Sequence, residues 1–377
     1  MKRIVLITTS FPRTVAGSES AGSFVEDFSA ALGRRCRLTV IAPGFGNTVE
    51  DGAGYSVHRY DSPERPLSQL KLWSPRDALQ ILKVMRHGSA VTATVVKAEK
   101  PDFVFALWAL PSGAWARQAT RGTSLPFGIW CLGSDIWSLG RIPVIRRILR
   151  STLRAARTVF ADGYLLGDEA HAIAGIDCQF LPSSRKLPIP AFTASRAGGP
   201  YRLLFIGRWH PNKGTDLLLE ALALLEDADW ALIEEVCIHG GGPQEAQVRQ
   251  CAVALQQAGR PVRAFGYIDK EKAAQALQQC DWLLIPSRIE SIPVVFSDAM
   301  QSHRPVISMP VGDLTKLVRQ LDVGVCADAV DARSFAAAIR TALRQSSLGY
   351  CARLEEAARL FDVDGSAERL LQAVDQG

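Results

Sequence analysis

Short apolar runs alternate along the whole chain with longer stretches in which apolar residues recur at helical spacing. Runs of this length and composition are typical of buried β-strands. In the first half they cover residues 3–9, 37–42, 102–107, 127–131, 158–161 and 179–181, and in the second half residues 202–207, 236–239, 262–265, 282–285, 305–309 and 324–326. Strands that alternate with helices form parallel sheets covered by helices, so the pattern predicts the α/β class.

The chain has 377 residues, which suits two domains rather than one core. The Pro-, Gly- and Ser-rich stretch 183–200 is the best candidate linker. We therefore expect two doubly wound, Rossmann-like domains facing a central cleft, at 1–182 and 201–354, and a C-terminal helix over 355–377 that packs back on the first domain. In such sheets, ligands bind beyond the carboxyl ends of the strands.

Composition excludes several classes of protein. No apolar run approaches the roughly 20 residues that span a bilayer, and the apolar start of the chain breaks at Phe11-Pro12, so a first buried strand is a better interpretation than a signal peptide. The eight cysteines are scattered without a Cys-x-x-Cys pair, which argues against a zinc site or a disulfide framework and favours a reducing cytoplasm. The net charge of +5 is modest.

Two cations lie in the loop that follows a predicted strand at Gly207. Arg208 offers a planar fork to phosphate oxygens and Lys213 offers a point charge. Either Thr215 or Asp216 can cap the helix that comes next. Cations fixed there would stabilise a nucleoside diphosphate as it leaves, although a solvated loop is the simpler alternative.

Three glycines end the next predicted strand, and Gly241 and Gly242 lie just before a helix. Bare backbone at the start of a helix can approach a nucleotide closely and donate amide hydrogen bonds. A tight turn alone would also explain the glycines, so this motif is weak by itself.

Two carboxylates, Glu290 and Asp298, lie eight residues apart where a loop runs into a helix. Carboxylates bind sugar hydroxyls well because both oxygens accept hydrogen bonds. The amides of Ile292, Val294 and Val295 would point at the anionic end of a donor. In the alternative interpretation, Glu290 caps the helix and Asp298 lies on a solvated face. Together with the two cations, the block describes a pocket for a nucleotide sugar.

These three segments, over residues 203–311, resemble the C-terminal domain of the large retaining glycosyltransferase family with the GT-B fold, the bacterial group 1 family that includes sucrose synthases and lipid-glycan mannosyltransferases. That family reads Gly-Arg-x(4)-Lys-Gly, Gly-x-Gly-Pro and Glu-x(7)-Glu. The resemblance implies that Arg208 and Lys213 contact the donor diphosphate and that Glu290 contacts the transferred sugar. Asp298 takes the place of the ribose-binding glutamate with a side chain one methylene shorter.

The first half resembles the same family less sharply. Ser10-Phe11-Pro12, followed by Gly17 and Gly22, is similar to its first donor-contacting loop. Gly133-Ser134-Asp135 is similar to a His-Gly-Ser-Asp turn in which Leu132 replaces the histidine, and the resemblance implies that Asp135 takes part in catalysis. Asp135 either faces the acceptor or caps a helix. Two further positions that often hold histidine are Phe105 and Leu107, beside Trp108.

The segment 141–157 has six arginines and no acid, and its isoleucines and leucines recur at helical spacing. One interpretation is a peripheral contact with an anionic membrane, or a seat for a phosphorylated lipid acceptor. The alternative is a helix that packs its apolar stripe into the domain and leaves the arginines in solvent. The segment lacks interleaved aromatics, so nucleic-acid binding is not expected.

The resemblance implies a metal-independent, retaining transfer of a sugar from a nucleotide-diphosphate donor to a hydroxyl of a glycan or lipid-linked acceptor, with no cofactor. Bacterial polysaccharide, lipopolysaccharide or lipid-glycan synthesis is the expected setting, in the cytoplasm, with a peripheral contact on the inner face of the plasma membrane. Two alternatives remain open. One is a catalytically degenerate GT-B protein that binds a nucleotide sugar or scaffolds glycan assembly. The other is a two-domain α/β ligand-binding protein.

Overall fold

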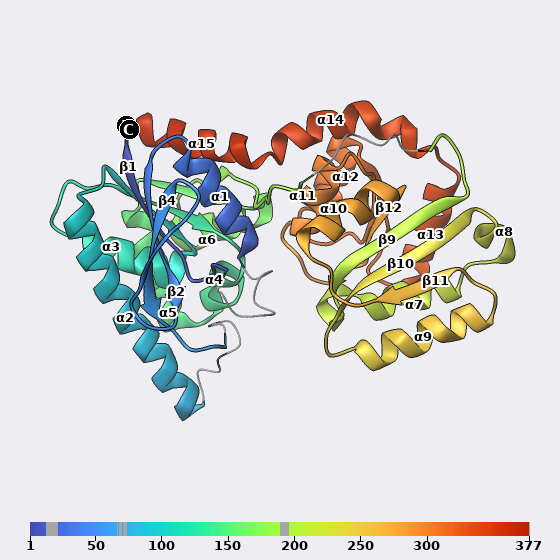
Figure 1. Ribbon diagram of the computed structural model, residues 1–377, viewed down its shortest axis with the longest axis horizontal. Helices are drawn as coiled ribbons and strands as arrows, with labels where there is room; N and C mark the ends of the chain where they lie inside the picture. Colours follow the sequence, from blue (N-terminus) through green and yellow to red (C-terminus); the bar gives the residue numbers. More distant parts are fainter. Residues whose placement is uncertain (13–21, 66, 68–69, 71–73, 189–195, 377) are drawn as a thin grey trace. The chain divides into compact units, whose positions relative to one another are not determined.

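The computed structural model describes residues 1–12, 22–65, 67, 70, 74–188 and 196–376. The chain forms two compact units, each built on its own sheet (Figure 1). The first unit comprises Met1–Arg185 and Val363–Gly377, and the second comprises Lys186–Asp362.

The first unit is built on an eight-stranded sheet in the order β3-β4-β2-β1-β5-β6-β7-β8. Every neighbouring pair is parallel except β3 and β4, which pair antiparallel. The strands are β1 (Arg3–Ile7), β2 (Arg37–Gly44), β3 (Val49–Asp51), β4 (Tyr55–Asp61), β5 (Phe103–Leu107), β6 (Phe127–Cys131), β7 (Thr158–Ala161) and β8 (Gln179–Phe180).

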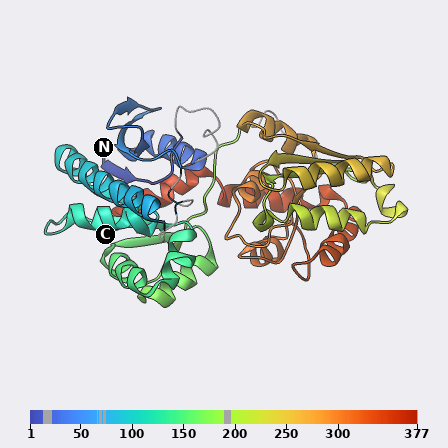
Figure 2. The same cartoon turned by 90° about the horizontal axis from the view of Figure 1, so that it is seen from below.

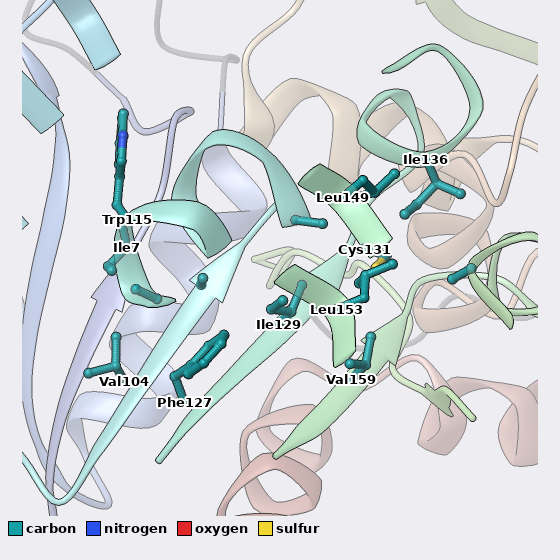
Figure 3. Packing of buried hydrophobic residues seen from close by; sticks show 14 of the residues in the cluster. Ile7, Val104, Trp115, Phe127, Ile129, Cys131, Ile136, Leu149, Leu153 and Val159 are labelled. Atoms are coloured by element: carbon teal, nitrogen blue, oxygen red, sulfur yellow. The ribbon is translucent and has the colours of Figure 1, made fainter. Parts of the chain in front are cut away.

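Helices cover both faces of this sheet, because side chains along a strand point alternately to either side. Ile4 and Leu6 of β1 belong to one buried cluster together with residues of α1 (Ser23–Gly33) and α15 (Val363–Asp375). Val5 and Ile7 belong to a second cluster, part of which Figure 3 shows. The helices that contribute to the second cluster are α2 (Pro75–Glu99), α3 (Ala114–Thr120), α4 (Ser134–Trp137), α5 (Pro143–Ala155) and α6 (Tyr164–Ala174).

The C-terminal part of the chain contains two helices rather than the single one expected over 355–377. The first, α14 (Cys351–Leu360), belongs to the second unit, and α15 belongs to the first. Ion pairs attach α15 to the segment just after α1, where Arg35 contacts Asp364 at 2.9 Å and Glu368 at 2.8 Å.

The sequence pattern did not predict the strand β4. Its sequence, Tyr-Ser-Val-His-Arg-Tyr-Asp, has a single aliphatic residue, so it does not stand out as an apolar run. The strand forms because Tyr55, Val57 and Tyr60 are nevertheless buried, and because Arg59 is buried with hydrogen bonds to Pro43 O and to Glu50.

The second unit is built on six parallel strands in the order β11-β10-β9-β12-β13-β14. The strands are β9 (Tyr201–Arg208), β10 (Ile233–Gly241), β11 (Val262–Phe265), β12 (Trp282–Ile285), β13 (Val306–Ser308) and β14 (Gly324–Cys326). Besides α14, the helices are α7 (Thr215–Ala223), α8 (Asp227–Trp230), α9 (Glu245–Gln257), α10 (Lys270–Gln279), α11 (Val294–Gln301), α12 (Leu314–Leu321) and α13 (Ala332–Leu343). Figure 2 shows the same elements from below.

The predicted α/β class and the two Rossmann-like parallel sheets are confirmed. The strand β9 lies between β10 and β12, so the loops that leave these three strands emerge side by side at one edge of the second sheet. None of the helices in the described residues is long and apolar enough to cross a membrane.

Candidate functional site

The loops that follow β9 and β12 pack directly on each other at the carboxyl edge of the second sheet. Gly214 has a left-handed backbone with φ +66°, and a Cβ placed on it would lie 1.9 Å from the carbonyl oxygen of Pro286. The amide of Arg288 donates a hydrogen bond to Asn212 O at 2.8 Å. Only glycine allows this approach, so the packing of the two loops explains why glycine follows Lys213.

Lys213 and Glu290, which are 77 residues apart in the chain, form an ion pair between these two loops. The hydroxyl of Ser287 donates a further hydrogen bond to the same carboxylate at 3.2 Å. The Lys213 side chain is 36% exposed and that of Glu290 is 13% exposed. The structure thus brings together a cation and a carboxylate that the sequence singled out in separate motifs, and leaves the cation accessible to a ligand.

A second ion pair, between the first turn of α7 and the loop after β12, was not predicted. Arg288 donates to both carboxylate oxygens of Asp216, at 2.7 and 2.8 Å, and to Pro211 O at 2.7 Å. Burial acts to raise the pKa of Asp216, but the hydrogen bonds and charge of Arg288 outweigh it and lower that pKa. No local sequence pattern signals this pair, because its partners are held together only by the packing of the two loops.

The prediction that Thr215 or Asp216 caps α7 is wrong. The N-cap of α7 is Gly214, and no side chain caps the helix. Thr215 is fully buried and Asp216 is bound to Arg288. Thr215 and Asp216 lie inside the first turn of α7, one and two residues after the N-cap position.

Arg208 lies beside the glycine turn at the end of β10. It pairs with Gly241 in the sheet register, and a Cβ on Gly242 would lie 3.4 Å from Arg208 Cγ. The side chain is exposed and forms no ion pair with any described residue. A Cβ on Gly240 would lie 1.9 Å from Gly207 O, so the glycines let the two strands end close together.

Tyr267 is a further residue at this edge that sequence reasoning missed. Its hydroxyl donates to Gly241 O at 2.6 Å, and a Cβ on Gly241 would lie 2.7 Å from its ring. The side chain is nevertheless 70% exposed. An accessible aromatic ring therefore lies against the glycine turn, and only its position after β11 could have indicated it.

The start of α11 presents free amides at the same edge. The N-cap is Pro293, which has no side-chain hydrogen bond, so the alternative in which Glu290 caps the helix is wrong. Within the described residues, the amides of Ile292, Val294 and Val295 have no hydrogen-bond acceptor. Unpaired amides at a helix start attract anions, and contact of these three amides with a donor stays a prediction.

Asp298 is the fifth residue of α11, just over one turn into the helix. Its side chain is fully buried, so the alternative of a solvated face is wrong. Its contact with a ribose stays a prediction.

The loop after β13 supports the Glu290 loop. Gly312 has φ +52°, and a Cβ on it would lie 2.1 Å from Glu290 O. The amide of Asp313 donates to Ser291 O at 3.3 Å. Gly312 therefore has a packing role beside the site.

In the first unit, Asp135 is 1% exposed and accepts hydrogen bonds from the amides of Ala109 at 2.7 Å and Leu132 at 3.3 Å. Burial raises the pKa of Asp135 to about 6, and these amides limit the rise. The N-cap of α4 is Gly133, so Asp135 is not the capping residue. The carboxylate holds the loop after β5 to the end of β6, and a direct role toward an acceptor stays a prediction.

Gly22 is the N-cap of α1 and has φ +82°. A Cβ on Gly22 would lie 2.7 Å from the amide nitrogen of Phe11, so the close approach of the two segments requires glycine. Gly17, the other glycine of this predicted loop, lies outside the described residues. Trp108 is half-buried with φ +68°, and its ring packs edge-on against Phe24.

The three positions at which histidines are expected belong to an apolar cluster. Phe105 and Leu107 are fully buried within it, and Leu132 packs against it. In the described part of the chain, no three His, Cys, Asp or Glu side chains gather in a way that could hold a metal ion.

Comparison with known proteins identifies the second unit most clearly. The family described as Glycosyl transferases group 1 matches residues 200–345. TuaC of Bacillus subtilis (strain 168), whose name assigns it to teichuronic acid biosynthesis as a glycosyltransferase, is 28% identical over 248 residues. The aligned region covers 62% of this chain and 59% of that protein.

Solved structures share the fold of the whole chain. Sucrose-phosphate synthase from Thermosynechococcus elongatus aligns over 100% of this chain and 99% of its own, with a TM-score of 0.71 and 18% identity. Anabaena HepE, in complex with UDP and glucose, aligns over 100% of both chains with a TM-score of 0.70 and 16% identity. The fold is therefore the GT-B fold.

Proposed function

We propose that this chain, which belongs over residues 200–345 to the group 1 glycosyl transferase family, transfers a sugar from a nucleotide-diphosphate donor to a hydroxyl acceptor. The observation that carries the proposal is the meeting of Lys213 and Glu290 between the loops after β9 and β12. The exposed Arg208 and the amides at the start of α11 lie at the same sheet edge. Cations, amides and a carboxylate are the groups that a diphosphate and a sugar require.

The donor diphosphate would bind to Arg208, Lys213 and the amides of Ile292, Val294 and Val295. Negative charge on the diphosphate grows as the sugar bond breaks, and fixed cations stabilise that charge. Lys213 forms an ion pair with Glu290. A diphosphate would compete for Lys213 and leave the Glu290 carboxylate to accept hydrogen bonds from sugar hydroxyls.

Retention of configuration and independence of metal ions are part of the proposal. Retention rests on the resemblance of the motifs to the retaining family. Metal independence rests on the two cations and the helix amides, which supply the charge that a metal would otherwise bring to the diphosphate. Adding EDTA to an assay tests the second point, because full activity is expected to remain.

For the donor and acceptor, we propose a nucleoside diphosphate sugar and a glycan or lipid-linked hydroxyl. HepE was solved in complex with UDP and glucose, and the name of TuaC refers to the synthesis of teichuronic acid. These relatives support a role in polysaccharide, lipopolysaccharide or lipid-glycan synthesis.

A degenerate, donor-binding protein is the second candidate. The observation that favours it is the apolar environment of Leu132, where the resemblance calls for a histidine near the transferred sugar. Such a protein would keep the diphosphate site of the second unit and lack turnover.

We also propose that the chain acts in the cytoplasm with a peripheral contact on an anionic membrane through α5. Val144 and Ile148 of α5 are 72% and 47% exposed beside the exposed Arg147. The other interpretation of this segment holds for its apolar stripe, because Leu149 and Leu153 of α5 are buried in the domain. It is wrong for Arg150 and Arg154, which donate to the terminal carbonyls of α6 at 2.7 Å.

Two measurements test the proposed function. Calorimetric titration with a panel of sugar nucleotides is expected to show binding of at least one donor, and release of free nucleoside diphosphate in the presence of an acceptor extract is expected to show turnover. Binding without turnover would favour the degenerate protein. No binding by any donor would contradict both candidates.

A further inference from the structure

The positive charge of the chain is concentrated in one segment of the first unit. Residues 75–157 contain thirteen Lys and Arg against four Asp and Glu, a formal net charge of +9. The rest of the chain contains thirty Lys and Arg against thirty-four Asp and Glu, so it is net negative, while the whole chain is +5. The segment contains α2, α3 and α5.

The helix α2 has a cationic and apolar outward face. Arg76, Leu79, Leu82, Lys83 and Arg86 are all exposed, and their spacing of three, four and seven residues places them on one side of the helix. Leu79 and Leu82 are 62% and 55% exposed. Large apolar side chains next to one another on a surface mark a binding face more often than single ones do.

The cations of this face are not neutralised by neighbouring acids. Across the described residues, Arg76, Lys83 and Arg86 form no ion pair. The acids of α2 lie on its other side, where Asp77 is buried against Arg65 and Glu99 pairs with Arg37. The described part of the chain therefore leaves the charge of the outward face uncompensated.

The outward faces of α2 and α5 point to the same side of the first unit. Both helices contribute to the cluster on one face of the sheet, through Val84 and Leu149 among others, and α3 packs between them. Arg117 of α3 and Arg121, which follows the helix, are also exposed. Figure 1 shows α2 running along the outside of this unit.

We propose that the outward face of α2 docks on an anionic lipid bilayer. Leu79 and Leu82 enter the boundary between headgroups and acyl chains, and Arg76, Lys83 and Arg86 bind lipid phosphates. The two exposed leucines favour a bilayer as the partner, because a soluble polyanion would contact only the cations. This inference deepens the membrane contact proposed for α5, and it does not depend on the donor chemistry of the second unit.

The test is co-sedimentation of the full chain with phosphatidylcholine vesicles, with and without phosphatidylglycerol. Two double variants, Lys83→Gln/Arg86→Gln and Leu79→Ser/Leu82→Ser, alter the face. Each has a matched control in the second unit. Lys272→Gln/Arg333→Gln removes the same charge from exposed sites. Val253→Ser/Leu348→Ser replaces two apolar residues that are 49% and 41% exposed.

We expect the wild type to bind only the anionic vesicles, and less at high salt. Each cation near the surface contributes on the order of five-fold to partitioning, so Lys83→Gln/Arg86→Gln should weaken binding by about twenty-fold. Leu79→Ser/Leu82→Ser should also weaken it, while both controls stay near wild type. Donor titration of all variants should be unchanged, which separates this proposal from the proposed transfer.

Four outcomes would overturn the proposal. The wild type could fail to bind anionic vesicles, or the control that removes charge from the second unit could weaken binding as much as Lys83→Gln/Arg86→Gln. The chain could bind soluble polyglutamate through Lys83 and Arg86, while Leu79→Ser/Leu82→Ser changes binding neither to polyglutamate nor to vesicles. That result would show that the face binds a soluble polyanion instead. If only a matching Val144→Ser/Ile148→Ser variant of α5 abolished vesicle binding, α2 would have no part in it.

Discussion

Gly214 packs against the carbonyl group of Pro286 so closely that no side chain fits between them. A Cβ at position 214 would lie 1.9 Å from that oxygen, and the backbone of Gly214 is left-handed. Pro286 begins the loop that carries Glu290, and Gly214 follows Lys213. The contact of Gly214 with Pro286 therefore sets how the cation and the carboxylate of the proposed donor site meet.

Gly214→Ala is expected to lower the free energy of unfolding of the second unit by about 2–4 kcal/mol, because it adds a backbone clash to a left-handed strain. The matched control is Gly259→Ala, where φ is +76° and no atom lies within 4 Å of the added Cβ. That variant should cost about 1 kcal/mol, from the backbone strain alone. Urea unfolding measures both, and equal losses would show that the two loops do not pack as described.

Arg288→Ala is expected to weaken donor binding by about ten-fold while the unit stays folded, because Arg288 joins Asp216 and Pro211 O to the loop of Glu290. Arg288→Lys should recover only part of the affinity, since lysine cannot form the two-pronged bond to a carboxylate. Calorimetry with a nucleoside diphosphate measures both variants, with Arg333→Ala as the control at an exposed arginine. Wild-type affinity in Arg288→Ala would contradict a positioning role for this residue.

Asp135→Asn is expected to change how stability depends on pH. The pKa of Asp135 is raised by burial from 3.8 to about 6, so the folded state holds the proton more tightly than the unfolded state. Asp135 therefore contributes up to about 3 kcal/mol to the free energy of unfolding. This contribution is fully present below about pH 4 and is lost as pH rises to about 6. The stability of the wild type relative to Asp135→Asn should fall over that window and stay level above it.

Urea unfolding of both chains between pH 4 and 8 measures this difference. Taking the difference cancels the other titrating groups, and Asp51→Asn, at an exposed strand position, serves as the control that should run parallel to the wild type. A constant difference between wild type and Asp135→Asn across the range would contradict the raised pKa.

The sequence predicted the sheets well where strands are continuous apolar runs, because burial on both faces requires such runs. It missed β4, in which burial is shared among two tyrosines, a valine and a paired arginine. Local patterns describe strands with aliphatic side chains and fail where a polar side chain is buried with a partner from another part of the chain.

The same limit applies to the candidate site. Lys213 and Glu290 were singled out because each lies in a recognisable motif. Arg288 and Asp216 were not paired, because their bond depends on how a loop packs against the start of a helix 72 residues away in the chain. Asp216 was instead predicted to cap a helix, because the neighbouring sequence suggests no other partner for its side chain.

The most direct test of the proposed donor site is calorimetric titration of UDP, GDP and ADP into the wild type and Lys213→Ala. Lys272→Ala is the control, since Lys272 is an exposed lysine of the same unit, 68% exposed. We predict that the best-binding diphosphate loses roughly ten- to hundred-fold in affinity in Lys213→Ala, as expected for one charge-assisted contact, and keeps it within about two-fold in Lys272→Ala. Equal affinities in Lys213→Ala and the wild type would contradict the proposed site.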